Sequence, residues 1–133
     1  MSERPEDVSD DQVLLLRRAA GRAYDRRTGF AKPSAFRLRT AKAELSLSFF
    51  DANMATPQQV LIGAPSNTWG VLAVSAGTLR ELGSRVVRER VPGMHVGEAH
   101  VSATPPAYED AQIPLELQLR LAVLCEWILI PTP

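Results

Sequence analysis

Proline and glycine interrupt this chain at short intervals, so only short helices and strands fit between the breaks. The clearest breaks are segments 32–34, 63–65 and 92–93, which read Lys-Pro-Ser, Gly-Ala-Pro and Pro-Gly. A polar stretch with two prolines, 104–113, adds another connecting loop. Proline lacks a main-chain donor and glycine adopts turn conformations at no steric cost, so each break is expected to end an element.

The first apolar pattern predicts a helix over about residues 10–27. Ser9 is a candidate N-cap, and Gln12 follows it by three residues, as in a capping box. Apolar side chains then recur at three- and four-residue steps from Val13 to Tyr24, which is typical of one buried helical face. We therefore expect the polar face of this helix to carry a ladder of arginines.

Alternating apolar and polar residues predict strands in the middle of the chain. The alternation runs over 36–39 and 45–49, as one bent strand or as two. Segments 85–91 and 98–103 read as the two arms of a hairpin around the turn at 92–93. A short apolar run at 71–74 is typical of a buried strand.

Two short helices are predicted from local capping signals. Thr56 and Pro57 supply a cap and a proline at the first helical position, and the helix is expected to end by about Ile62. Ser75 or Thr78 is expected to cap the second short helix.

The last element has two open interpretations. Leucines alternate as in a strand from Leu115 to Leu121, yet Leu117, Leu121 and Leu124 also share a helical face. Length and a proline at the start favour a helix over about 114–129, with a strand as the alternative.

Together these elements predict an α+β fold: a small mixed or antiparallel sheet of about five strands flanked by N- and C-terminal helices. The length of 133 residues suits a single domain. We expect residues 1–9 to form an acidic, flexible tail and residues 10–133 to form that domain.

The charge is distributed unevenly, although the net charge is +0. Residues 12–43 hold nine basic side chains and a single acidic one, Asp25. Such a block is a candidate surface for phosphate, nucleic acid or an acidic partner. It is also compatible with packing beside acidic neighbours in the same fold, or with a face that is simply solvated.

The residues that carry common chemistries are sparse. The two histidines, His95 and His100, lack metal-site spacing, and the single cysteine, Cys125, lies in an apolar run where buried thiols are usually inert. Glycine-rich phosphate loops and serine elbows are missing from the sequence. We expect no metal site and no cofactor.

Three segments carry a resemblance to known sequences. They are 33–36 with 45–47, 56–57 with 60–61, and 76–83 continuing through 86–87 to 99–101. Together they resemble small, uncharacterised bacterial single-domain proteins. The resemblance implies a bacterial, operon-encoded protein and lends no catalytic residues.

The leading functional hypothesis is a non-enzymatic accessory module that docks on a protein partner in a bacterial multi-gene system, such as a defence or toxin–immunity locus. Its docking residues would be Arg18, Arg22, Arg26 and Trp69, because arginine and tryptophan are enriched at interaction hot spots. The apolar C-terminal segment is a second candidate surface, for a partner or for a second copy.

Two alternatives stay open. The first is binding of nucleic acid or phosphate through the basic block 12–43. The second is a small enzyme in which arginine holds a phosphate-bearing substrate and histidine or a carboxylate moves a proton. The residues of that site would be Ser34, Arg37, Asp51, Glu98 and His100.

The sequence also bears on location. The first residues are acidic, whereas a secretory signal begins with positive charge, and the most apolar stretch, 121–130, is interrupted by Glu126. It is also far shorter than the roughly 20 residues that span a bilayer. We expect a cytoplasmic protein that makes no membrane contact.

Overall fold

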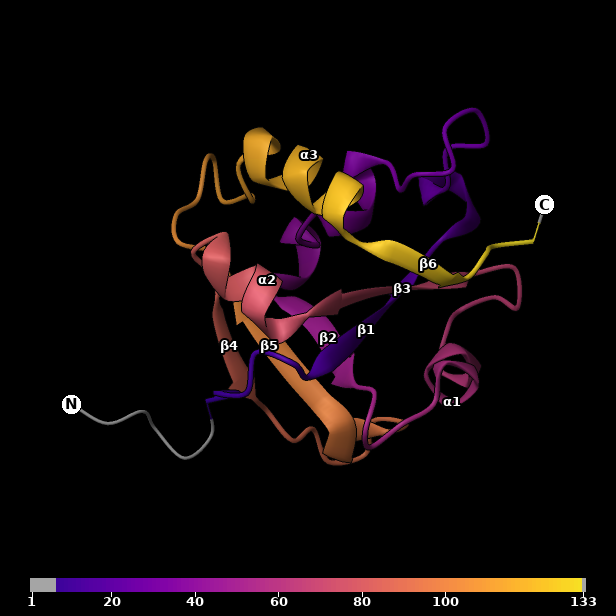
Figure 1. Cartoon of the computed structure of the whole chain (residues 1–133), viewed down its shortest axis with the longest axis horizontal. Helices are drawn as coiled ribbons and strands as arrows, with labels where there is room; N and C mark the ends of the chain where they lie inside the picture. The colour runs from indigo at the N-terminus through magenta and orange to yellow at the C-terminus, as the bar shows by residue number, and fades with distance from the viewer. Residues whose placement is uncertain (1–6, 133) are drawn as a thin grey trace.

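The structure, a computed structural model, describes residues 7–132. The described residues form one six-stranded antiparallel sheet with three α-helices (Figure 1). The strands are β1 (Leu14–Ala19), β2 (Leu47–Asp51), β3 (Gly70–Ser75), β4 (Arg85–Arg88), β5 (His100–Thr104) and β6 (Glu126–Leu129). The helices are α1 (Pro57–Ile62), α2 (Ala76–Glu81) and α3 (Leu115–Leu124).

The strand order is β4-β5-β2-β1-β3-β6, with every neighbouring pair antiparallel. The sheet lies between two apolar layers. The larger layer holds side chains from α2 and α3, such as Leu79 and Leu121, and the smaller one holds Val60 of α1. Figure 1 shows α2 and α3 together and α1 apart from them. The predicted α+β class is therefore confirmed.

The prediction of a helix over residues 10–27 is wrong. Strand β1 occupies its centre, between β2 and β3, and exposes neither Leu15 (0%) nor Leu16 (1%) because an apolar layer covers each face. A strand buried on both faces has a continuous apolar run, which resembles a helical stripe. The residues expected to cap that helix, Ser9 to Gln12, instead form a turn, in which the Gln12 amide donates to the Asp10 carboxylate at 2.9 Å.

The C-terminal segment combines both of its interpretations. Helix α3 ends at Leu124, Cys125 is extended, and β6 then pairs with β3. The physical reason lies in β3, whose outer edge would otherwise have no main-chain hydrogen-bond partners. The predicted helix over 114–129 is therefore too long, because its last residues, Glu126–Leu129, form strand β6 instead.

The segment at 36–39 is also not the predicted strand. Residues Pro33–Phe36 form a 3₁₀ helix that buries Phe36 against the larger apolar layer. The main chain of Leu38 forms hydrogen bonds with the Gln112 side chain and not with a neighbouring strand. The Leu38 amide donates to Gln112 Oε1 at 2.6 Å, and Gln112 Nε2 donates to the Leu38 carbonyl at 3.0 Å.

Locally signalled elements are confirmed. The capping box of α1 is formed, with Thr56 Oγ1 accepting from the Gln59 amide at 3.1 Å and Gln59 Oε1 accepting from the Thr56 amide at 2.8 Å. Ser75 caps α2 by accepting from the Thr78 amide at 3.1 Å. Strands β4 and β5 form the predicted hairpin, but the first arm ends at Arg88 instead of residue 91, and a 3₁₀ helix, Gly97–Ala99, precedes the second arm.

Part of the acidic N-terminal segment lies outside the described residues, namely residues 1–6. Within the described part, Asp7 makes a bridge to Val87 of β4, and the amide of the buried Val8 donates to the Val86 carbonyl at 3.0 Å. Arg80 of α2 donates to the carbonyl of Val8, to that of Ser9 and to the Asp11 carboxylate.

Candidate functional site: an arginine-lined cavity

A cavity of about 610 Å³ opens beside the point where β1 and β2 separate. The ladder between these strands pairs Leu15 with Asp51 and Leu16 with Phe50, and it ends there. Strand β1 stays paired with β3 as far as Ala19. The second half of β1 therefore presents its free edge to the cavity rather than to β2.

The side chain of Arg17 forms hydrogen bonds across the gap where the main chains of β1 and β2 no longer pair. Its Nε donates to the Ala35 carbonyl at 2.9 Å, and its Nη1 donates to the Ser48 carbonyl at 3.0 Å. Its guanidinium also lies 6.0 Å from the ring centre of Phe36 and 5.8 Å from that of Phe49. Burial lowers the pKa of Arg17 to about 10, so the side chain is still charged at neutral pH.

Arg18 points to the opposite face of the sheet. Its Cζ lies 5.1 Å from the ring centre of Phe50, within cation–π range, and its Nη1 makes a long contact of 3.5 Å to the Val60 carbonyl. Burial lowers the pKa of Arg18, and the nearby positive charge of Arg39 lowers it further. A guanidinium in this environment gains stability from an added negative charge.

Arg39 has a carboxylate partner. Its Nη2 donates to Glu44 Oε2 at 2.7 Å, its Nε donates to the same oxygen at 3.0 Å, and its main-chain amide donates to Oε1 at 2.6 Å. Burial opposes the ionisation of Glu44, but these hydrogen bonds outweigh it and the pKa of Glu44 is lowered. The pair is therefore fully ionised at neutral pH.

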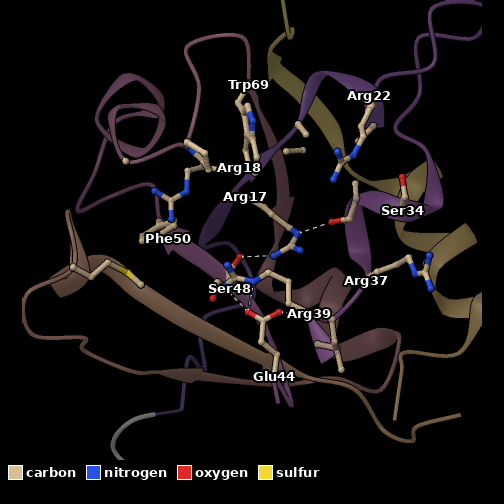
Figure 2. Close-up of a pocket in the computed structure, with 18 residues that line it drawn as sticks. Arg17, Arg18, Arg22, Ser34, Arg37, Arg39, Glu44, Ser48, Phe50 and Trp69 are labelled. Atoms are coloured by element: carbon tan, nitrogen blue, oxygen red, sulfur yellow. Dashed lines mark hydrogen bonds and ion pairs between the residues drawn. The ribbon is translucent and has the colours of Figure 1, made fainter. Parts of the chain in front are cut away.

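Arg22 and Arg37 complete the set of arginines that line the cavity (Figure 2). Both side chains are exposed, and neither makes a hydrogen bond or an ion pair within residues 7–132. Figure 2 shows the Arg17 guanidinium near the centre of the view, with the other four arginines around it. Five guanidinium groups thus share one cavity with one carboxylate, Glu44.

The arginines reach this cavity from three elements. Arg17 and Arg18 lie on β1, Arg22 lies on the 3₁₀ helix Gly21–Ala23, and the remaining two follow the 3₁₀ helix Pro33–Phe36. The chain thus returns past β1 and brings two stretches of the basic block, 17–22 and 37–39, to the walls of one cavity. Uncompensated positive charge on concave, partly dehydrated walls attracts anions strongly.

Ser48 connects the cavity wall to a buried histidine. The ring of His100 bonds through Nε2 to Ser48 Oγ at 3.0 Å and through Nδ1 to the Glu89 carbonyl at 2.8 Å. A carbonyl only accepts, so Nδ1 of neutral His100 carries the proton and Nε2 accepts from the serine hydroxyl. The Glu89 carboxylate lies 3.6 Å from Nδ1 and accepts a hydrogen bond from Ser102 Oγ at 2.7 Å.

The structure brings together three of the four residues predicted to dock a partner. Arg18, Arg22 and Trp69 line the cavity, with Trp69 half-buried in the loop before β3. Arg26 lies outside it and stacks on Tyr24, with its Cζ 5.5 Å from the ring centre. Their predicted common helical face does not exist, because β1 and a 3₁₀ helix replace the helix.

The residues of the predicted enzyme site are divided. Ser34 and Arg37 line the cavity. Asp51 is buried and accepts from Arg88 Nη1 at 2.7 Å and from the Asn53 amide at 2.8 Å, so its role is structural. Glu98 pairs on the surface with Arg90 at 2.7 Å. His100 lies behind Ser48 and does not line the cavity.

Sequence reasoning did not single out Arg17, Arg39, Glu44 or Ser48 as site residues. Arg17 and Arg39 belong to the basic block, so their charge was visible in the sequence. The contribution of Ser48 depends on where the β1–β2 ladder ends, which no local pattern encodes.

The described part of the chain contains no group of three or more histidine, cysteine, aspartate or glutamate residues arranged to hold a metal ion. Among the helices of residues 7–132, none has the length and apolar character needed to cross a membrane. Comparisons with protein families, curated proteins and solved structures found no match to this chain.

Proposed function

We propose that this protein binds a phosphate-bearing small molecule in the arginine-lined cavity. One observation carries the proposal: four of the five lining arginines, all except Arg39, have no carboxylate partner within the described residues. Planar guanidinium groups match phosphate oxygens in a bidentate geometry, and such charge-assisted bonds are among the strongest in proteins.

The size and shape of the cavity favour a small ligand. Its volume of about 610 Å³ lies within the range of about 300–1,000 Å³ that is typical of ligand sites. Trp69 contributes an aromatic face at the wall, and aromatic faces stack on nucleobases. A nucleoside diphosphate or triphosphate would therefore use both the arginines and the indole.

Calorimetric titration with ATP, GTP and inorganic pyrophosphate tests the proposal, with adenosine as the uncharged control. The variant Arg22→Gln/Arg37→Gln removes two exposed guanidinium groups that bond to nothing in the described residues, so the fold should persist. Losing charge-assisted contacts should weaken binding about tenfold or more. The matched control is Arg26→Gln, in the same basic block but outside the cavity.

Three results would count against a phosphate site: no binding of any phosphate probe at low salt, equal affinity in the double variant, or an equal loss in Arg26→Gln. Single-stranded oligonucleotides belong in the same titration. Preference for them over mononucleotides would move the assignment to nucleic acid, the sequence-based alternative.

A second candidate function is nucleophilic chemistry at Ser48, favoured by the 3.0 Å contact to His100 Nε2. In this hypothesis Oγ forms a bond to the phosphorus of a bound terminal phosphoryl group while the bond to the leaving oxygen breaks. The hydroxyl proton passes to His100 Nε2, while the leaving diphosphate departs as an anion on the opposite side of the phosphorus; when the serine is released, Nε2 returns the proton to Oγ. Water subsequently releases phosphate from the serine.

Phosphate release from ATP, measured for the wild type and for Ser48→Ala, tests this chemistry. The matched control is Ser46→Ala, two residues away on the same segment. Hydrolysis that survives Ser48→Ala rejects the role of Ser48, whereas selective loss with retained ATP binding supports it.

The sequence-based hypothesis of an accessory protein that docks on a partner remains a further proposal, as do a bacterial origin and a cytoplasmic location. Arg18, Arg22 and Trp69 would then hold an acidic segment of the partner in the same cavity. Competition between ATP and that partner would be expected, because both would use the same guanidinium groups.

A further inference from the structure

Helix α3 carries an apolar surface on the side that faces away from the sheet. Its inner side is buried through Leu117 and Leu121, as the larger apolar layer requires. Its outer side carries Leu115, Leu119 and Val123, which are 62%, 49% and 61% exposed. These three side chains follow one another at four-residue steps and therefore form one stripe.

Single exposed apolar residues are common, but a contiguous stripe on a helix is not. A helix that is apolar on both sides is normally buried on both sides. No described segment covers the outer side of α3, as the exposure of Leu119 and Val123 shows. The surface therefore fits an interface whose second half comes from another molecule.

The charges beside the stripe indicate what that molecule is. Glu116 and Arg120 are both exposed, lie next to the stripe and form no ion pair within residues 7–132. One negative and one positive charge, a turn apart, make a surface with no net charge. Such a surface does not favour a strongly acidic or basic partner, but it is complementary to its own copy in the opposite direction.

We propose that two copies of this chain associate through α3, with the two helices antiparallel about a two-fold axis near Leu119. Leu119 then meets its own counterpart, and Leu115 meets Val123 of the second copy. Glu116 comes within side-chain reach of Arg120 of the second copy, twice per interface because of the symmetry. The proposal is independent of the ligand in the cavity.

Sedimentation-velocity measurements over a concentration series test the association. We expect a reversible dimer for the wild type and a monomer for Leu119→Glu, because the two introduced carboxylates face each other at the axis. Leu119 is half-exposed, so the variant should keep the wild-type circular dichroism and thermal unfolding. A wild-type monomer at the highest attainable concentration, or an unchanged dimer in Leu119→Glu, overturns the proposal.

Charge exchange tests the antiparallel arrangement and the identity of the partner. Glu116→Arg and Arg120→Glu should each weaken the dimer about tenfold, because each places like charges opposite one another. The combined variant Glu116→Arg/Arg120→Glu should restore wild-type association, since both pairs are reversed together. Failure of the combined variant to recover rejects this geometry, and Glu109→Arg, an exposed charge change outside α3, is the control.

Discussion

Arg17 Nη1 donates to the main-chain carbonyl of Ser48 at 3.0 Å, across the gap where β1 and β2 stop pairing. The same serine bonds through its hydroxyl to His100 at 3.0 Å. A half-buried cation on one strand thus positions the backbone of the residue that joins the cavity to the histidine. Removing Arg17 would disturb both the sheet and the site.

We expect Arg17→Met to lower the free energy of unfolding by about 2 kcal/mol, because the carbonyls of Ala35 and Ser48 would lose their donors. Urea denaturation measures the change. Arg37→Gln is the matched comparison, since it removes an exposed guanidinium from the same cavity and should leave stability within about 0.5 kcal/mol. Equal stability of Arg17→Met and the wild type would show that these hydrogen bonds contribute nothing net.

Asp51 should be required for stability and not for ligand binding. Asp51→Ala leaves the Arg88 guanidinium and the Asn53 amide without their carboxylate, so we expect a loss of about 2–3 kcal/mol. Glu98→Gln breaks an exposed pair with Arg90 and should cost less than about 1 kcal/mol. A well-folded Asp51→Ala protein that fails to bind ATP would contradict the structural role given to Asp51.

The thiol of Cys125 should be unreactive in the folded protein. Burial raises the pKa of Cys125 from 9.0 to about 12, and the charge of Arg17 only partly offsets this. A disulfide reagent at pH 8 should label Cys125 only after denaturant is added, because the thiolate is the reactive form. Rapid labelling of the native protein would show that the site is open.

The same shift predicts a pH dependence. Between about pH 9 and pH 12 the unfolded chain loses the Cys125 proton while the folded chain retains it. The free energy of unfolding therefore falls as pH rises through this window, by up to about 1.4 kcal/mol per pH unit from this group. Other groups titrate there as well, so the difference between the wild type and Cys125→Ala isolates the contribution of Cys125.

Arg80 should hold the start of the described chain. Arg80→Ala removes the donors to the carbonyls of Val8 and Ser9, with an expected cost of about 1–2 kcal/mol. Hydrogen exchange at the Val8 amide, which bonds to Val86, should then become faster while exchange in β5 is unchanged. Unchanged exchange at Val8 would mean that the bridge to β4 suffices alone.

The amino-acid sequence alone determined those helices and strands that are stabilised by contacts between residues close together in the chain. The capping box of α1, the serine cap of α2 and the β4–β5 hairpin each depend on side chains and turns close in the chain. The α+β class followed from their order. The basic block 12–43 likewise predicted where the positive charge of the site would come from.

The tertiary structure alone decided how the leucine-rich segments fold. The leucines 14–16 are compatible with a helix or a strand, and they begin β1 because β2 and β3 supply hydrogen bonds on both sides. The C-terminal segment becomes helix and then strand because the outer edge of β3 needs a partner. The cavity also depends on long-range pairing, because it forms where the β1–β2 ladder ends after Leu16. The free energy of such pairing comes from segments far apart in the chain, so no short stretch of sequence contains it.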